Sequence, residues 1–192
     1  MDTKGPPRVD LIKLFLARQP IFDSHLKVYG YELLHRSCET CAFDSAADGD
    51  AASLGVLANT LLTFGPETVL GGKRAFINFT RELLVGNLAL VMPADSLVVE
   101  ILESIVPDEE VVAACRRLRQ RKYALALDDF GPEALTEPLV EHASILKVDF
   151  RATTESDRKQ IARRFARPGL ELLAEKVETQ EEVDWARREG FH

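Results

Sequence analysis

The chain is poor in the residues that hold zinc, with three cysteines and four histidines among 192 residues. Cys38 and Cys41 form a C-x-x-C, but a structural zinc site needs four ligands, and neither a second C-x-x-C nor an H-x-x-x-H pair follows. This scarcity argues against a zinc-stabilised fold. Proteins of a reducing compartment keep free thiols, so we expect these cysteines to be reduced.

Long apolar runs and an excess of basic residues are also missing. No run approaches the roughly 20 residues of a membrane-spanning helix, and residues 1–10 lack the apolar core of a signal peptide. We therefore expect a cytoplasmic protein without a membrane partner. The formal net charge of -7 argues against binding to a nucleic-acid polymer, whose phosphates need a basic surface. It still permits a small anion held by a few local cations or metal ions.

The sequence does contain a regular alternation of strand-like and helix-like segments. Two extended runs, residues 15–22 and 27–36, are separated by a gap short enough only for a hairpin, so the first two strands should be antiparallel. An amphipathic helix over residues 51–64 follows. Later strands each precede a helix, which predicts parallel strands with right-handed crossovers. These predicted strands are 74–80, 96–103, 123–128, 145–149 and 170–175, and the predicted helices are 81–86, 108–121, 133–142, 155–166 and 179–189.

This order predicts an α/β fold, a (β/α)8 TIM-like barrel with an antiparallel first strand. Seven strands can be counted, whereas a closed barrel takes about 250 residues, so we expect the last strand and helix to be missing. Residues 1–14 should form an N-terminal tail and lead-in, and residues 15–192 one barrel domain. The rival architecture, an open doubly wound sheet, needs a glycine-rich loop that opens a helix, but Gly71-Gly72-Lys73 precedes a strand.

Six of the strand-like runs end on side chains that could hold a metal ion, a phosphate or a proton. A carboxylate inside a Val/Ile/Leu run is costly to bury unless it is paired or coordinated. Taken singly, such residues are more often salt-bridged or loop-capping, but six in order favour one shared site at the carboxyl ends of barrel strands. The residues are Glu32 and Arg36, Asn78, Glu100 and Glu103, Asp128 and Asp129, Lys147 and Asp149, and Glu175 and Glu178.

Seven short motifs give the chain a family resemblance. In chain order they read ARQPIFD, YELLHR, INFT, VVEILES, ALDDFG, ILKVD and LAEKVET. Together, over about residues 15–192, they resemble the EAL domain, the barrel of bacterial cyclic di-GMP phosphodiesterases. The opening is more particularly similar to the branch in which an HDOD domain follows the EAL-type domain, and hydrolase activity is often lost in that branch.

The resemblance implies a site for Mg²⁺ or Mn²⁺. It implies that Glu32, Asn78, Glu100 and Asp128 hold the first ion, and that Asp129 is associated with a second ion. Oxygen ligands of this kind suit hard divalent cations. In-line hydrolysis of a phosphodiester also uses such ions, often in pairs.

The resemblance assigns the remaining strand-end residues to catalysis and substrate binding. Lys147 matches the lysine that steadies the water and the phosphate, and Glu175 matches the general base. Arg36 matches the arginine that grips a substrate phosphate, with Gln19 as a further contact. Glu103 resembles the carboxylate that anchors the loop after the Asp-Asp-Phe-Gly segment. The further acidic candidates are Asp149 and Glu178.

The chain departs from the family pattern at four places. Leu33 replaces the signature alanine, a volume change in the barrel wall that should leave Glu32 in place. Residues 132–136 replace a longer Thr-Gly-Tyr-Ser-Ser-Leu loop, which helps to form the second metal site and the dimer contact. Lys176 stands where glycine usually follows the base, so it could pair with Glu175 or lower the pKa of that carboxyl. The last strand, with the glutamine that completes the site, is absent.

We therefore expect an EAL-type domain of bacterial cyclic di-GMP signalling that is catalytically weak or inactive and serves as a nucleotide-binding or regulatory module. The first alternative is an active Mg²⁺- or Mn²⁺-dependent cyclic di-GMP phosphodiesterase that produces linear pGpG. The second is a protein-interaction scaffold without nucleotide binding. Besides cyclic di-GMP, the partners left open are a second copy in a homodimer and an HDOD domain or other signalling protein.

Overall fold

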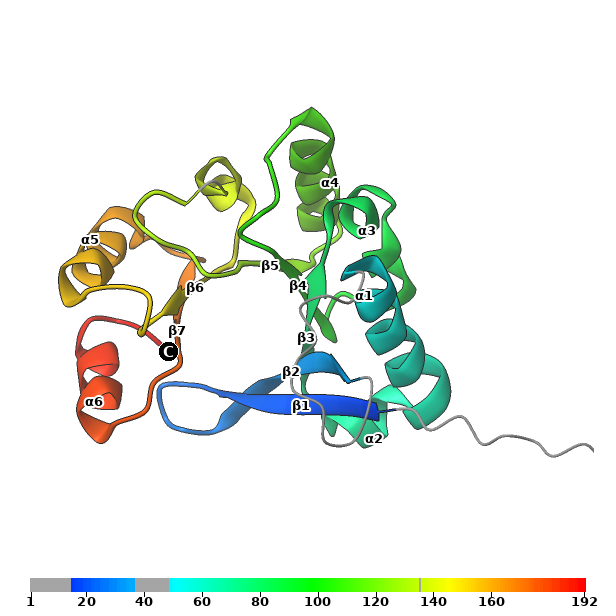
Figure 1. Ribbon diagram of the computed structural model, residues 1–192, viewed down its shortest axis with the longest axis horizontal. Helices are drawn as coiled ribbons and strands as arrows, with labels where there is room; N and C mark the ends of the chain where they lie inside the picture. Colours follow the sequence, from blue (N-terminus) through cyan, green and yellow to red (C-terminus); the bar gives the residue numbers. More distant parts are fainter. Residues whose placement is uncertain (1–14, 37–48, 135) are drawn as a thin grey trace, which may run out of the picture.

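A curved sheet of seven strands forms the centre of the structure, a computed structural model that describes residues 15–36, 49–134 and 136–192. Neighbours in the sheet follow chain order, with β1 antiparallel to β2 and all later pairs parallel. Figure 1 shows the sheet curling into a ring that is open between β7 and the β1–β2 hairpin. The strands are β1 (Phe15–Phe22), β2 (Val28–Arg36), β3 (Arg74–Phe79), β4 (Leu97–Ile101), β5 (Ala124–Leu127), β6 (Ile145–Asp149) and β7 (Glu171–Glu175). The predicted barrel type, strand order and antiparallel first strand are confirmed.

The first two strands join in a tight hairpin. The Asp23 carboxylate accepts hydrogen bonds from the backbone N–H groups of His25 (2.8 Å) and Lys27 (2.9 Å). Leu26 adopts a left-handed backbone, with φ at 58°, and its N–H donates to the Asp23 carbonyl. The turn is too short for a crossover, so the strands must pair antiparallel. This pairing places Gln19 opposite Glu32.

Helices cover the outside of the ring (Figure 1). Several helices begin after a residue whose side chain accepts a hydrogen bond from a free N–H group of the first turn. Asp108 accepts from Val111 N–H at 2.9 Å, and Thr154 and Thr179 each form a capping box. The helices are α1 (Gly49–Ala58), α2 (Pro66–Leu70), α3 (Arg81–Val85), α4 (Glu109–Gln120), α5 (Glu155–Phe165) and α6 (Gln180–Arg188), with the π-helix η1 (Asn59–Phe64) and the 3-10 helices η2 (Leu88–Val91) and η3 (Glu137–His142). In the described residues no helix has the length and apolar character needed to span a membrane.

Two of the predicted helices differ from the structure. The helix expected at 51–64 becomes α1 followed by η1, a change from α to π geometry. The helix expected at 133–142 is a turn that leads into η3, where Pro138 lacks the N–H that a longer α-helix would need. The sequence also gave no signal for α2, because five residues are too few to show a helical period.

The inner and outer faces of the sheet have separate apolar layers. Outward side chains pack against the helices in the larger layer. The inner layer is formed by Ile21, Phe76, Val98, Ala126, Ile145 and Leu173. Because side chains alternate along a strand, the residues two positions further on also point into the ring. In five parallel strands these residues are Asn78, Glu100, Asp128, Lys147 and Glu175.

The free edge of β7 is partly paired. Phe191 forms a parallel bridge with Leu172, and His192 N–H donates to the Leu172 carbonyl at 2.7 Å. The Ala174 N–H in turn donates to the His192 carbonyl at 2.8 Å. Residues 191 and 192 thus lie where a further parallel strand would begin. No eighth strand occurs within residues 15–36, 49–134 and 136–192.

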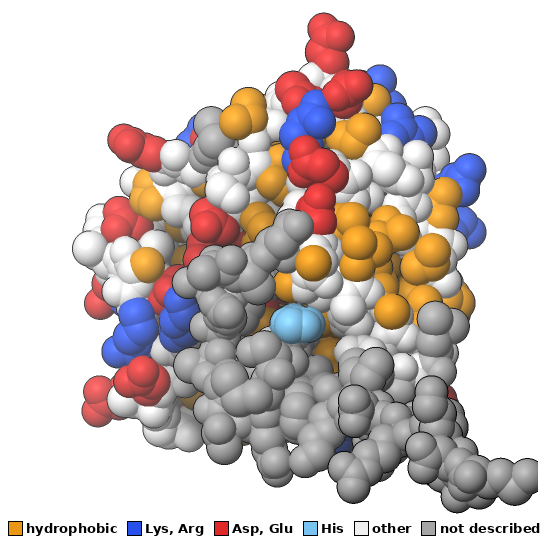
Figure 2. Space-filling model, turned by 45° about the vertical axis from the view of Figure 1, so that its right-hand side comes forward, with side chains coloured by type: hydrophobic (Ala, Val, Ile, Leu, Met, Phe, Trp, Pro, Cys, Tyr) orange, Lys and Arg blue, Asp and Glu red, His pale blue; other side chains and the backbone are white. Residues whose placement is uncertain are grey.

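The surface carries some exposed hydrophobic side chains. Figure 2 shows one face of the molecule, where hydrophobic side chains gather below a group of acidic and basic ones. The large hydrophobic residues that are exposed in the described chain are Phe22, Leu26, Leu54, Phe64, Leu90, Val91 and Val106.

Candidate functional site

Side chains from six strands meet at the carboxyl end of the parallel sheet. Four come from β3, β4, β6 and β7, Asp128 directly follows β5, and Glu32 joins them from β2, where it pairs in register with Phe76 of β3. A cavity of about 660 Å³ opens at this end of the ring. Of the six, Glu32, Asn78, Asp128, Lys147 and Glu175 line it, and Glu100 is fully buried.

The Lys147 ammonium lies at the centre of this group. Its Nζ is 2.7 Å from Glu100 Oε1, 2.7 Å from Asp128 Oδ1 and 2.9 Å from Glu175 Oε1. Glu32 Oε1 is further away, at 3.9 Å. One buried cation therefore faces four carboxyl groups in a place with little solvent.

Two of the buried side chains at this site have oxygens without a hydrogen-bond partner among the described residues. They are Oδ1 of Asn78 and both carboxylate oxygens of Glu100. Of the two Glu100 oxygens, Oε1 faces the Lys147 ammonium at 2.7 Å as an ion pair, so Asn78 Oδ1 and Glu100 Oε2 are the site oxygens without any polar partner among the described residues. Buried acceptors normally have a partner, and such orphan oxygens are what a bound cation would satisfy.

Burial raises the pKa of the acidic groups here. Desolvation raises the pKa of Glu100 to about 8 and that of Glu175 to about 7, although the Lys147 charge opposes the change at both. Burial also raises the pKa of Glu32 and of Asp129, with the Asp128 charge adding to the effect. The pKa of Lys147 is raised well above its usual value, because the attraction of Glu100, Asp128 and Glu175 exceeds the effect of burial. A carboxyl group with a pKa near 7 suits a general base.

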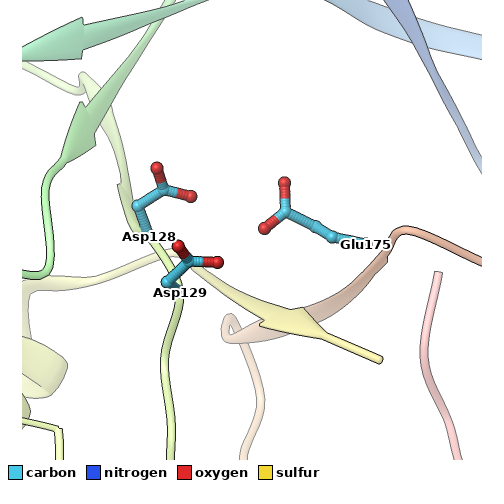
Figure 3. Close-up of side chains that lie close together, drawn as sticks. All are labelled: Asp128, Asp129 and Glu175. Carbon is cyan, nitrogen blue, oxygen red and sulfur yellow. The ribbon is translucent and has the colours of Figure 1, made fainter. Parts of the chain in front are cut away.

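Three carboxylates form an outer cluster beside Lys147. Figure 3 shows Asp128 and Asp129, which follow β5, facing Glu175 from β7. One oxygen from each lies within 4.8 Å of the others. The next residue, Phe130, is buried and its N–H donates to the Lys147 carbonyl at 2.7 Å, which fixes the turn that presents both aspartates.

Lys176 pairs with Asp149, and not with Glu175, the partner that its sequence position suggested. Its Nζ forms an ion pair with Asp149 Oδ2, while Glu175 pairs with Lys147. Asp149 Oδ1 accepts hydrogen bonds from the N–H groups of Arg151 (2.6 Å) and Ala152 (3.1 Å). Burial would raise the pKa of Asp149, but Lys176 and these two N–H groups lower it.

The remaining predicted residues are less central. Gln19 and Glu103 line the same cavity and are exposed. Glu178 is exposed outside the cavity lining, with Oε2 at 4.0 Å from Arg151. The backbone of Arg36 ends β2, while its side chain lies outside the described atoms, as do Cys38 and Cys41. The third cysteine, Cys115, is buried in α4, where desolvation raises the pKa of its thiol to about 12.

Some of the cavity residues were not singled out from the sequence, and two of them are basic in type. Arg187 of α6 and His192 both line the cavity. Arg187 lies in a helix rich in charged residues, so the sequence alone does not distinguish it from an ordinary surface arginine. His192 has no ligand-like spacing to another histidine, and the sequence therefore offered no signal for either residue.

The donor set fits a hard divalent cation. Glu32, Asn78, Glu100 and Asp128 carry the oxygen donors that such an ion prefers, and their role as its ligands stays a prediction. In the described residues, the carboxylates with oxygens within 4.8 Å of one another are Asp128, Asp129 and Glu175. Mg²⁺, Mn²⁺ and Ca²⁺ all accept such ligands, whereas a soft ion would need sulfur or imidazole. The outer cluster with Asp129 offers further carboxylate oxygens.

Comparisons with known proteins identify relatives of this chain. An uncharacterized protein of Bacillus subtilis, YuxH, is 41% identical over 185 residues, which are 94% of this chain and 45% of that protein. A Vibrio cholerae relative named cyclic di-GMP phosphodiesterase CdgJ is 35% identical over 190 residues, 98% of this chain and 44% of that protein. The chain thus spans a little under half the length of these relatives.

Among solved structures, the manganese and cyclic di-GMP complex of Klebsiella pneumoniae BlrP1 has the same fold. The TM-score is 0.67 at 21% identity, and the match covers 97% of this chain and 55% of that one. The family model described as the EAL domain matches residues 72–192, which is more than half of the chain and includes every strand from β3 to β7. The protein belongs to the EAL domain family.

Proposed function

We propose that this chain binds cyclic di-GMP through one divalent cation at the carboxyl end of its barrel and hydrolyses it slowly to linear pGpG. The observation that carries the proposal is the orphan oxygens of Asn78 and Glu100, buried beside Lys147 and oriented with it into the ring. The ligand is supported by the name of the Vibrio cholerae relative, and the ion by the manganese in the Klebsiella structure. Mg²⁺ and Mn²⁺ both fit the oxygen donors.

The residues divide into ion-binding and reacting groups. Glu32, Asn78, Glu100 and Asp128 would hold the ion, which when bound polarises a phosphoryl oxygen and makes water more acidic. Glu175 accepts the proton of the attacking water, since its pKa of about 7 leaves a useful fraction ionised at neutral pH. Lys147 stays protonated and places positive charge where negative charge develops on the phosphate.

Slow turnover follows from the outer part of the site. In-line hydrolysis is fastest with two cations about 3.5–4 Å apart. In the sequence, residues 132–136 are a shorter segment than the loop that helps to form the second metal site in the resembled family, and η3 begins at Glu137. Losing one positioned electrostatic partner costs about 10²- to 10³-fold in turnover.

Calorimetric titration of cyclic di-GMP with and without Mn²⁺, followed by chromatography for pGpG, tests the function. We expect binding that requires Mn²⁺ and turnover at least about a hundredfold below 1 per second. The variant Glu100→Gln should lose ion-dependent binding. Glu178→Gln, the change of an exposed glutamate outside the cavity, should keep it. Equal nucleotide binding with and without Mn²⁺ would contradict the proposal.

A fully active phosphodiesterase is the second candidate function. It is supported by the name of the Vibrio cholerae relative, a cyclic di-GMP phosphodiesterase. Turnover near 1 per second, within the usual enzyme range, would select this candidate. If the titration with cyclic di-GMP gives no heat with or without Mn²⁺, the result would indicate a scaffold that binds no nucleotide. The cytoplasmic location, the homodimer and the HDOD partner stay predictions.

A further inference from the structure

Lys176 has an unusual backbone for its position. It follows Glu175 directly, at the end of β7, and its φ of 54° lies in the left-handed region. That region suits glycine, and a side chain there is held in place by its surroundings. Non-glycine residues in strained backbone positions cluster at functional sites, which makes the Lys176 side chain a candidate for a functional role.

The surroundings hold Lys176 at both its backbone and its side chain. Arg151 Nε donates to the Lys176 carbonyl at 3.1 Å. At the other end, the Lys176 ammonium is paired with Asp149, which is itself buried and fixed by two backbone N–H groups. The loops after β6 and β7 thus hold a cation at a set place, although the Lys176 side chain is 57% exposed.

This cation lines the same cavity as Asp129 and Glu175 of the outer carboxylate cluster. The charges of Asp149, Asp129 and Glu175 all act on Lys176. Conversely, the Lys176 charge opposes the effect of burial on the Asp129 carboxyl. Asp129 and Glu175 belong to the three carboxylates whose oxygens lie within 4.8 Å of one another.

We infer that the Lys176 ammonium takes the place of a second metal ion at the site. The chain then binds one divalent ion tightly and a second one only weakly. A fixed positive charge in the same cavity lowers the affinity for a dication by about tenfold or more at the effective dielectric of a protein surface, although the paired Asp149 carboxylate offsets part of that charge. The tight ion uses the deep set of Glu32, Asn78, Glu100 and Asp128. The weak position is the outer cluster. This inference rests on the metal-dependent function proposed above.

Removing the charge of Lys176 should therefore create a usable second ion site. In Mn²⁺ titration calorimetry of the full chain, we expect one tight ion for the unchanged protein. Lys176→Met should bind a second ion at least about tenfold more tightly than the unchanged protein does. Lys176→Arg keeps the charge and should behave as the unchanged protein. Lys176→Gly, which suits the left-handed backbone, gives the same test if the Met variant does not fold.

Lys122 provides a matched control, because it is also an exposed lysine with a left-handed backbone, at φ 68°, before β5. Lys122→Met should leave the titration unchanged. The inference is overturned if Lys176→Met and Lys176→Gly bind no more Mn²⁺ than the unchanged protein, if Lys122→Met gives the same gain, or if the unchanged protein already binds two ions equally well. If no variant binds any ion, the proposed function itself has failed, and the inference fails with it.

Discussion

Lys147 Nζ lies 2.7 Å from Glu100 Oε1 in a place where the two side chains are only 1% and 0% exposed. Removing one partner of a buried ion pair destabilises a protein by much more than the intact pair stabilises it. Here the same ammonium also faces Asp128 and Glu175, so the stability of the metal-free protein depends on it.

Lys147→Met should therefore destabilise the metal-free protein by about 3–5 kcal/mol, because the buried carboxylates lose their shared cation. Urea unfolding monitored by circular dichroism measures the change. Added Mn²⁺ should restore part of the loss. The control Lys159→Met removes an exposed lysine that pairs with Glu155 on α5 and should cost under about 0.5 kcal/mol. Equal stability of Lys147→Met and the unchanged protein would contradict the central role of Lys147.

The metal-free protein should become less stable as pH rises from 6 to 8.5. Glu100 and Glu175 have folded-state pKa values of about 8 and about 7, above the ordinary 4.5, so the folded state holds more protons than the unfolded state in this window. Stability is then lost as pH rises through those values. Lys147 stays protonated throughout, and the lowered pKa of Asp149 acts only at lower pH.

Thermal melts at the two pH values check this sign. For a chain of this size, each kcal/mol lowers the melting temperature by about 2–4 °C. Glu100→Gln should flatten the dependence, because it removes the group with the highest carboxyl pKa. A melting temperature that rises between pH 6 and 8.5 would show that the two carboxyl groups are ionised in the folded, metal-free protein.

Glu175→Gln should abolish hydrolysis while leaving nucleotide binding almost intact. The amide cannot accept the proton of water, and general-base catalysis is worth about 10²- to 10⁴-fold. Chromatography of pGpG and calorimetry of cyclic di-GMP measure the two properties separately. Glu178→Gln is the control, three residues further along the chain. Full turnover by Glu175→Gln would assign the base to another group.

Gly30→Ala should destabilise the barrel by about 1–3 kcal/mol through overpacking. A Cβ at Gly30 would lie 2.8 Å from Phe76 Cε2 and 2.9 Å from the Arg74 carbonyl oxygen. Because Gly30 precedes Glu32 by two residues on β2, Mn²⁺ affinity should fall as well. The control Gly131→Ala adds a Cβ that meets nothing within 4 Å. Unfolding midpoints in urea distinguish the two, and equal midpoints would contradict the tight packing at Gly30.

The fold, and the meeting of polar side chains at the strand ends, could be predicted from local patterns. The hairpin follows from its short turn, and alternation along the strands brings Asn78 and Glu100 to the same side as the inner apolar layer. The strand ends then meet because parallel strands share a direction. These features depend on residues that are close in the sequence, so they can be recognised from one sequence alone.

Other features depend on contacts between distant segments. Lys176 pairs with Asp149 rather than Glu175 because its left-handed backbone and the neighbouring loop direct the side chain there. The π geometry of η1 and the place of Arg187 on the cavity wall likewise come from tertiary packing. No local pattern in the sequence carries this information.

The most direct test of the account is anomalous diffraction at the manganese edge from crystals of the chain grown with Mn²⁺. The account predicts a strong peak with oxygens of Glu32, Asn78, Glu100 and Asp128 at about 2.0–2.6 Å. Glu100→Gln crystals should lack the peak or show it much weakened. A peak elsewhere, or these four side chains more than about 4 Å from any common ion, would contradict the proposed metal site.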